Sequence, residues 1–262
     1  WKEYGAVLKE GLYEDAERKD TLLDLCRFST NENDEIMSLS SYLEKMPENQ
    51  KDIYYISAET RSQALASPHL EGFKSKNIPV LIMTDAIDQF WLPMIGSFKD
   101  KKFTSITQGQ INLDDLDEKN KDKKSENKDQ KEKQGKEFVD LIAQMKVVLG
   151  EQVKDIRLSS KLTDSPVCLV ADDGDMDIAM EQLMAQRDTN YKGAPRILEI
   201  NGDHSLIKNM KSLLSKKENN DLVSDAGTLL FEQARLLEGK MPADPAQFSK
   251  IMNQFLIKAI PE

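Results

Sequence analysis

Hydrophobic residues recur along this chain with two different periods, and the changes between them predict the order of its elements. Over residues 1–50, apolar positions such as Tyr4, Val7 and Leu8 have the spacing of amphipathic helices. From residue 51, short runs of β-forming residues alternate with helical stretches. This rhythm predicts a helical region at 1–50, followed by a small parallel-type α/β layer at 51–110.

The boundaries of these first elements follow from the same pattern. Ser38 is a candidate N-cap for the third helix. Pro68 and Pro93 each lie inside a helical stretch and are expected to interrupt it. The expected helices span 1–12, 15–28, 38–46, 60–77 and 87–98, and the expected strands span 52–57, 78–84 and 101–107.

The charged stretch at 111–135 contains almost no apolar residue, and its acids and bases nearly balance. It predicts a solvated linker between two domains. Beyond it, residues 136–262 predict a mixed α/β domain that ends in a pair of helices. Its expected helices span 138–150, 176–188, 205–217, 222–239 and 244–260, and its expected strands span 153–159, 165–171 and 196–200.

The composition limits the possible partners. Of the 262 residues, 31% are charged, and the net charge of −10 argues against nucleic acid or an anionic membrane as the partner. No apolar run approaches the roughly 20 residues of a membrane span. Cys26 and Cys168 both lie in apolar surroundings, which favours buried, reduced thiols in a reducing compartment over the alternative of a single long-range disulfide. The chain enters a helical pattern at Trp1, and we expect an internal or C-terminal piece of a longer protein.

Motifs for catalysis or metal binding are weak in this sequence. It has neither a G-x-G-x-x-G nor a P-loop motif, and its two histidines lack zinc-site spacing. The acidic run at 172–177 lacks the spacing of a calcium loop and is better explained as an acidic helix start. Asp203, His204 and Ser205 are adjacent in one turn, so we expect Asp203 or Ser205 to cap the next helix rather than form a triad.

Several motifs occur in the order found in the heat-shock protein 90 chaperones. They are ENQKDIYYIS (48–57), LTDSPVCLV (162–170), LEINGDH (198–204) and DPAQFSKIMNQFL (244–256). LKEGLYED (8–15), LCRFST (25–30) and SLSSYLEKM (38–46) support them, so the resemblance covers nearly the whole chain. The sequence most resembles the bacterial members of this family.

The resemblance implies the later part of a middle domain at 1–110 and a C-terminal dimerisation domain at 136–262. It implies a cytoplasmic, homodimeric chaperone that binds non-native client proteins. ATP and magnesium would bind upstream of Trp1 in the full-length family. The piece itself is then expected to hold no cofactor or metal and to be no enzyme.

The resemblance also implies two sets of site residues. Client contacts are expected at Phe90, Trp91, Met94, Met180, Leu183 and Met184. A homodimer interface is expected at Leu229, Leu230, Leu236, Leu237, Phe248, Ile251, Met252, Phe255 and Leu256.

Two of these assignments have alternatives in the sequence itself. Phe90 and Trp91 could equally be core residues. Met176, Met180, Leu183 and Met184 lie at i, i+4, i+7 and i+8, a stripe that could face either a core or a partner. We expect Met176 to be the buried end of this helix and the other three to face the partner. A purely structural dimerisation scaffold, in which the stripe is core, is the competing hypothesis.

Overall fold

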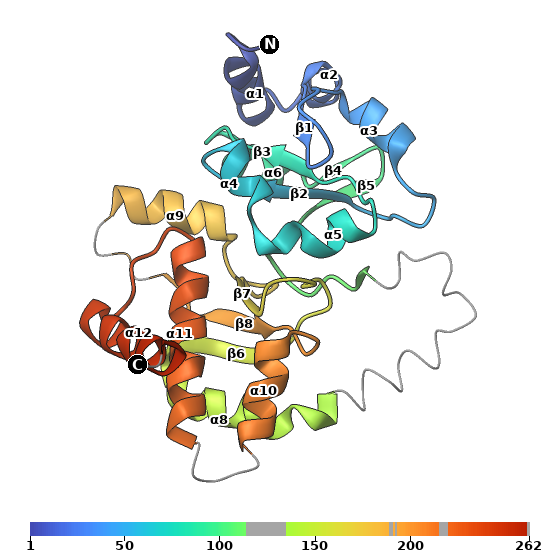
Figure 1. Ribbon diagram of the computed structural model, residues 1–262. Coiled ribbons are helices and arrows are strands. Elements are labelled where there is room, and N and C mark those ends of the chain that lie inside the picture. The colour runs from blue at the N-terminus through green and yellow to red at the C-terminus, as the bar shows by residue number, and fades with distance from the viewer. Residues whose placement is uncertain (114–134, 189–190, 192, 215–219, 261–262) are drawn as a thin grey trace. The chain divides into compact units, whose positions relative to one another are not determined.

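The computed structural model describes residues 1–113, 135–188, 191, 193–214 and 220–260 (Figure 1). Most of the predicted charged linker, residues 114–134, therefore lies outside the described residues. The described chain packs as two compact units. One contains the described residues of 1–121 and 171–194, and the other contains those of 122–170 and 195–262. The sequence interpretation assigned 171–194 to the C-terminal domain, and its domain boundaries stay a prediction.

The first unit is an α/β layer, as the alternating pattern predicts. Its helices are α1 (Gly5–Glu14), α2 (Lys19–Leu25), α3 (Leu39–Lys45), α4 (Arg61–Leu65), η1 (Pro68–Leu70), α5 (Glu71–Ser75), α6 (Asp88–Ile95) and α9 (Ile178–Arg187). Its strands are β1 (Ser29–Thr30), β2 (Ile53–Ser57), β3 (Leu81–Met83), β4 (Ser97–Phe98) and β5 (Lys101–Ser105). The order in the sheet is β1-β3-β2-β5-β4. The three predicted strands pair in parallel, and the two-residue strands that the pattern missed pair antiparallel at the edges.

Alternate residues of β2 and β3 enter two different cores, because successive side chains of a strand point to opposite faces. Ile53 and Leu81 pack with residues of α1, α2, α3 and α6. Tyr54 and Ile82 pack with residues of α4, η1 and α5 on the other face. The sheet is thus covered on both faces, which explains why 78–84 is a continuous apolar run.

Two predicted helix boundaries in this unit are wrong. The helix expected at 15–28 ends at Leu25, and the backbone of Cys26 is already extended. Phe28 then forms a β-bridge with Met37. Pro93 does not interrupt α6, which continues to Ile95. The predicted N-cap of α3 is confirmed, since the Ser38 side chain accepts a hydrogen bond from the backbone of Ser41.

The second unit is a three-stranded sheet with helices packed on one face. Its helices are α8 (Val139–Leu149), η4 (Gly150–Gln152), α10 (Ser205–Leu214), α11 (Asn220–Leu237) and α12 (Pro245–Ala259). Its strands are β6 (Val153–Leu158), β7 (Val167–Val170) and β8 (Arg196–Ile200), with β8 in the centre. β8 is parallel to β6 and antiparallel to β7. The predicted α/β fold class is confirmed.

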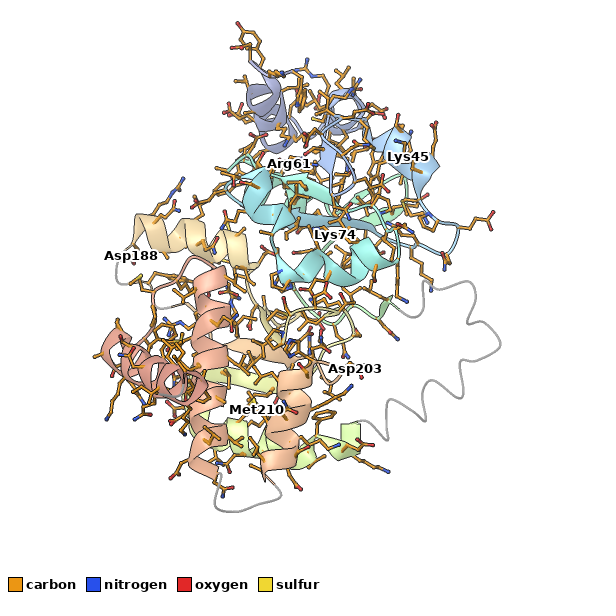
Figure 2. All side chains as sticks on the ribbon, viewed as in Figure 1. Lys45, Arg61, Lys74, Asp188, Asp203 and Met210 are labelled. Carbon is orange, nitrogen blue, oxygen red and sulfur yellow. The ribbon has the colours of Figure 1, made fainter. Side chains whose placement is uncertain are left out.

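The helix-covered face holds the largest core of the protein. Leu198 and Ile200 of β8 are completely buried there against α8, α10 and α11. Met210, labelled in Figure 2, belongs to the face of α10 that enters this core. The opposite face of β8 carries Glu199, which is buried and accepts two hydrogen bonds from Arg157 at 3.0 and 2.9 Å. Such hydrogen bonds offset the cost of burying a polar side chain.

A buried ion cluster fixes α6 against α1 in the first unit. Lys9 Nζ lies 2.9 Å from Asp85 Oδ2 and 2.9 Å from Asp88 Oδ2. Asp88 Oδ1 accepts a hydrogen bond of 2.8 Å from Trp91 Nε1, and Lys9 lies over the ring of Phe28. Burial opposes the charge of Lys9, yet the two carboxylates raise its pKa above the ordinary value. Burial raises the pKa of Asp88, and Lys9 and Trp91 limit that rise.

Both cysteines are buried as reduced thiols, as predicted. Burial raises the pKa of Cys26 to about 11, so this thiol stays protonated at neutral pH. In the part of the chain that the structure describes, no helix has the length and apolarity needed to cross a membrane.

We predict that Asp88→Asn lowers the free energy of unfolding by about 3 kcal/mol, because it leaves the buried Lys9 with only Asp85. The matched control is Asp24→Asn, which removes a surface carboxylate 3.8 Å from Lys99 and should cost less than about 1 kcal/mol. Urea unfolding followed by circular dichroism measures both. Equal, small losses would show that the buried cluster does not stabilise the fold.

Candidate functional site

Asp177 is the N-cap of helix α9, and its carboxylate has two roles. Oδ1 caps the helix by accepting a hydrogen bond of 2.9 Å from the backbone of Ala179. Oδ2 accepts hydrogen bonds from Ser105 Oγ, at the end of β5, at 2.5 Å and from Thr107 Oγ1 at 2.9 Å. An N-cap residue stabilises a helix locally. Here the same side chain also fastens the helix to the sheet of the first unit.

Further hydrogen bonds join the same two segments. The amides of Gly109 and Ala171 donate to the carbonyls of Ala171 and Thr107, respectively. Gln108 Nε2 donates to the carbonyl of Asp175 at 2.7 Å. The acidic run at 172–177 is therefore a turn and a helix cap, as expected. The described residues contain no group of three or more potential ligands that could hold a metal ion.

The faces of α9 differ from the predicted stripe. The helix starts at Ile178, so Met176 lies before it and is 40% exposed; the expectation that Met176 is the buried end is wrong. Ile178 and Glu181 are buried instead, and Glu181 accepts a hydrogen bond from the backbone of Ala194. Met180 and Met184, four residues apart, share a half-buried face, and Leu183 borders it.

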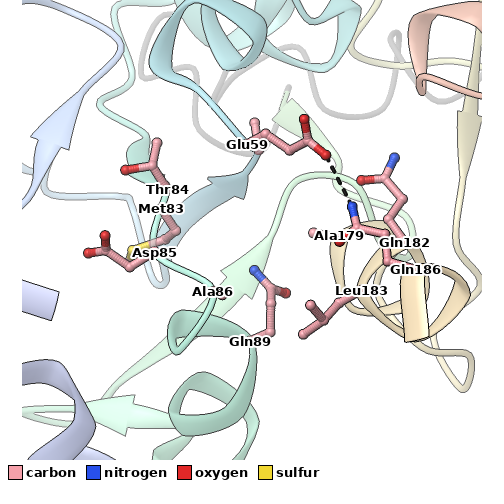
Figure 3. Close-up of a pocket in the computed structure, with 11 residues that line it drawn as sticks. Glu59, Met83, Thr84, Asp85, Ala86, Gln89, Ala179, Gln182, Leu183 and Gln186 are labelled. Carbon is pink, nitrogen blue, oxygen red and sulfur yellow. Dashed lines mark hydrogen bonds between the residues drawn. The ribbon is translucent and has the colours of Figure 1, made fainter. Parts of the chain in front are cut away.

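A pocket of about 270 Å³ lies between α9 and the loop that joins β3 to α6 (Figure 3). Its α9 wall is formed by side chains at i, i+3, i+4 and i+7, which lie on one face of a helix. Glu59 bridges to this wall by accepting a hydrogen bond of 3.2 Å from Gln186 Nε2. The other residues on its walls are Ala58, Met83, Thr84, Asp85, Ala86, Gln89, Ala179, Gln182 and Leu183.

Phe90, Trp91 and Met94 of α6 differ in how much of each side chain is exposed. Trp91 is completely buried and is therefore a core residue, which was the alternative to a client contact. Phe90 is half-buried and makes an edge-to-face contact with Tyr13, with ring centroids 6.1 Å apart. Tyr13 is 51% exposed and Met94 is 49% exposed. Tyr13, Phe90 and Met94 thus leave apolar surface uncovered on the first unit.

The residues predicted for the dimer interface fall into three groups by exposure. Leu230 and Ile251 are 4% exposed and belong to the interior of their own unit. Leu229, Phe248 and Phe255 are half-buried. Four residues leave apolar surface uncovered on α11 and α12, namely Leu236, Leu237, Met252 and Leu256. Ile257, which the sequence interpretation did not include, is 73% exposed.

His204 has a local role at the turn before α10, beside the labelled Asp203 in Figure 2. Its Nδ1 accepts a hydrogen bond of 3.1 Å from the backbone of Leu206. The expectation that Asp203 or Ser205 would cap this helix is therefore wrong. Asp203 instead accepts a hydrogen bond of 3.1 Å from Lys208 Nζ. With Nδ1 bound to a backbone amide, this ring is positioned as a helix cap.

Comparison with known proteins assigns the chain to a family. The family model described as Hsp90 protein matches residues 1–261. The chain belongs to the Hsp90 family. Its relatives include proteins named Chaperone protein HtpG from Roseobacter denitrificans, 40% identical over 262 residues, and from Streptomyces coelicolor, 39% identical over 253 residues. These matches cover 99% and 96% of the chain, but 42% and 39% of the relatives, so the chain spans about two fifths of their length.

The predicted resemblance to the Hsp90 chaperones, and to their bacterial members, is thus confirmed. Sequence reasoning missed Tyr13 and the pocket residues Glu59 and Asp85. Tyr13 was overlooked because it lies 77 positions (90 − 13) from its partner Phe90. Nothing local marks Glu59 as part of a pocket, since its bond to Gln186 joins residues 127 positions apart.

We predict that Asp177→Ala speeds amide hydrogen exchange in residues 178–187 about tenfold, because it removes both the cap and the attachment to β5. The double variant Ser105→Ala, Thr107→Val keeps the cap bond to Ala179 and removes only the attachment. It should speed exchange at least about threefold. Hydrogen exchange followed by mass spectrometry measures both. Unchanged exchange in the double variant would mean that only the cap stabilises α9.

Proposed function

We propose that this chain supplies the client-binding surface and the homodimer interface of an Hsp90 chaperone. The observation that carries the proposal is that uncovered apolar side chains gather in two places, one in each unit. The first place includes Tyr13 and Met94, and the second includes Leu237 and Ile257. Contiguous exposed apolar surface on a protein marks sites of interaction.

The client surface lies in the first unit, on α6 and α9. Phe90 offers an aromatic ring supported by Tyr13, and Met180 and Met184 offer flexible, polarisable side chains. Hydrophobic contact is non-directional, so such a surface binds non-native segments of many sequences. The fastening of α9 by Asp177 supports this assignment, because it presents the methionine face from a positioned helix.

The dimer interface lies in the second unit, on α11 and α12. The two helices pack against one another, and Leu237, Met252 and Leu256 remain exposed in the single chain. The corresponding pair from a second copy would cover them in a four-helix bundle across a two-fold axis. The dimer would bring two client surfaces together and raise their effective concentration.

The ATP-dependent step belongs, in this proposal, to the part of a longer protein that carries the nucleotide site. ATP and magnesium would act there, and this chain would respond to their binding without hydrolysing ATP itself. The relatives named HtpG are more than twice as long as this chain, which leaves ample length for such a domain. The reducing cytoplasm is the proposed location and is compatible with two buried, reduced thiols.

For client binding, we predict that Met180→Ser with Met184→Ser weakens binding of a permanently unfolded, fluorescent polypeptide about tenfold. The loss of two apolar contacts accounts for a reduction in affinity of this size. The free energy of unfolding should change by less than about 1 kcal/mol, because both residues are only half-buried. Fluorescence anisotropy and urea unfolding measure the two effects. The control Val147→Ser removes a 79% exposed apolar side chain from α8 and should leave binding unchanged.

The competing hypothesis of a purely structural scaffold expects the opposite result. If the methionine face is core, the double serine variant loses several kcal/mol of stability. An unfolded polypeptide would then bind with equal affinity to every variant that remains folded.

For dimerisation, we predict that Leu237→Asp and Leu256→Asp each convert the dimer to monomers. A buried, uncompensated carboxylate at the interface costs several kcal/mol. Sedimentation velocity measures the change. Val147→Asp adds the same charge to α8 and should remain dimeric. Dimers in both leucine variants would refute an interface on α11 and α12.

A further inference from the structure

The pocket beneath α9 combines carboxylates with apolar walls. We propose that it binds the side chain of an arginine or lysine carried by a non-native polypeptide. This inference rests on the proposed client-binding function and adds a charge preference to it. Clients would then be recognised by a basic residue in the pocket and by apolar residues on the neighbouring methionine face.

The charge of the pocket is negative. Glu59 and Asp85 both line it, and none of the described residues on its walls is basic. Glu59 is exposed, and Gln186, its hydrogen-bond partner, is a neutral amide that adds no positive charge beside the carboxylate. Asp85 shares Lys9 with the buried Asp88, so one cation faces two carboxylates. A cationic group entering the pocket therefore meets an excess of negative charge.

The apolar part of the pocket suits the stem of a long basic side chain. Met83, Ala86 and Leu183 lie on its walls and offer methyl and methylene groups. Lysine and arginine bury their aliphatic stems along such surfaces while the charged head reaches polar groups. The amide of Gln89 on the facing wall can accept a hydrogen bond from the head group. A volume of about 270 Å³ accommodates one side chain of this kind with some water.

The position of Leu183 links the pocket to the methionine face. Leu183 lines the pocket and is also adjacent to Met184, on the border of the face that Met180 and Met184 share. An extended segment can therefore place a basic residue in the pocket and an apolar residue against the methionines. The net charge of −10 favours the approach of basic segments over acidic ones.

The test uses the 262-residue chain and two fluorescein-labelled extended peptides, identical except that one carries arginine where the other carries citrulline, its neutral isostere. We expect the arginine peptide to bind about fivefold more tightly in fluorescence anisotropy. Glu59→Gln should reduce this preference to less than about twofold, and higher salt should also reduce it. The control Glu44→Gln removes an exposed carboxylate from α3, outside the pocket, and should keep the full preference.

A second variant tests the site by shape rather than charge. Ala86→Trp fills the pocket from an exposed position and should lower the affinity for the arginine peptide to that for the citrulline peptide. Equal affinities of the two peptides for the unchanged chain would overturn the pocket assignment while leaving client binding intact. Failure of both peptides to bind would overturn the proposed client-binding function as well.

Discussion

The arrangement of the candidate site depends on the carboxylate of Asp177. One of its oxygens caps the N-terminus of α9 by accepting a hydrogen bond from the backbone of Ala179. The other accepts hydrogen bonds from the hydroxyls of Ser105 and Thr107. Because one side chain serves both purposes, the helix and its attachment form together. Without it, the far wall of the pocket and the methionine face would lose their position relative to α6. The proposed client site on this unit therefore depends on a polar contact, although the surface that it would present is largely apolar.

A second polar cluster determines what α6 presents. Lys9, Asp85 and Asp88 are held together in a core that is otherwise apolar, and Trp91 donates to Asp88 from within it. With Trp91 directed inward, its neighbour Phe90 remains at the surface beside Tyr13. The buried charges thus orient the aromatic residues of α6, and burial alone would not have distinguished two adjacent aromatic side chains.

Much of the fold could be predicted from the sequence, because its signals are local. The apolar runs that form β2 and β3, the cap at Ser38 and the pair of final helices all follow from patterns within a few residues. The two-residue strands β1 and β4 were missed because they are defined only by their pairing partners. The family resemblance suggested the proposed function, which periodicity alone left open.

The candidate site was predicted less completely, because long-range contacts define it. The bond between Ser105 and Asp177 spans 72 positions, and no local pattern shows that α9 packs with the first unit. The pocket could not be predicted for the same reason, because its walls come from three segments that are distant in the sequence. Helical spacing placed Met180, Leu183 and Met184 correctly on α9, but it wrongly included Met176 and could not reveal that Leu183 also faces a cavity.

The two buried thiols have a practical consequence for measuring motion. Cys26 is completely buried with a pKa of about 11, and Cys168 is enclosed beside Glu199. Burial shields both sulfur atoms from a maleimide dye in the folded chain. Single cysteines introduced at exposed positions, such as Arg187 on α9 and Glu44 on α3, would therefore take donor and acceptor dyes selectively. The native sequence is already a suitable background for single-molecule energy transfer between α9 and the rest of its unit.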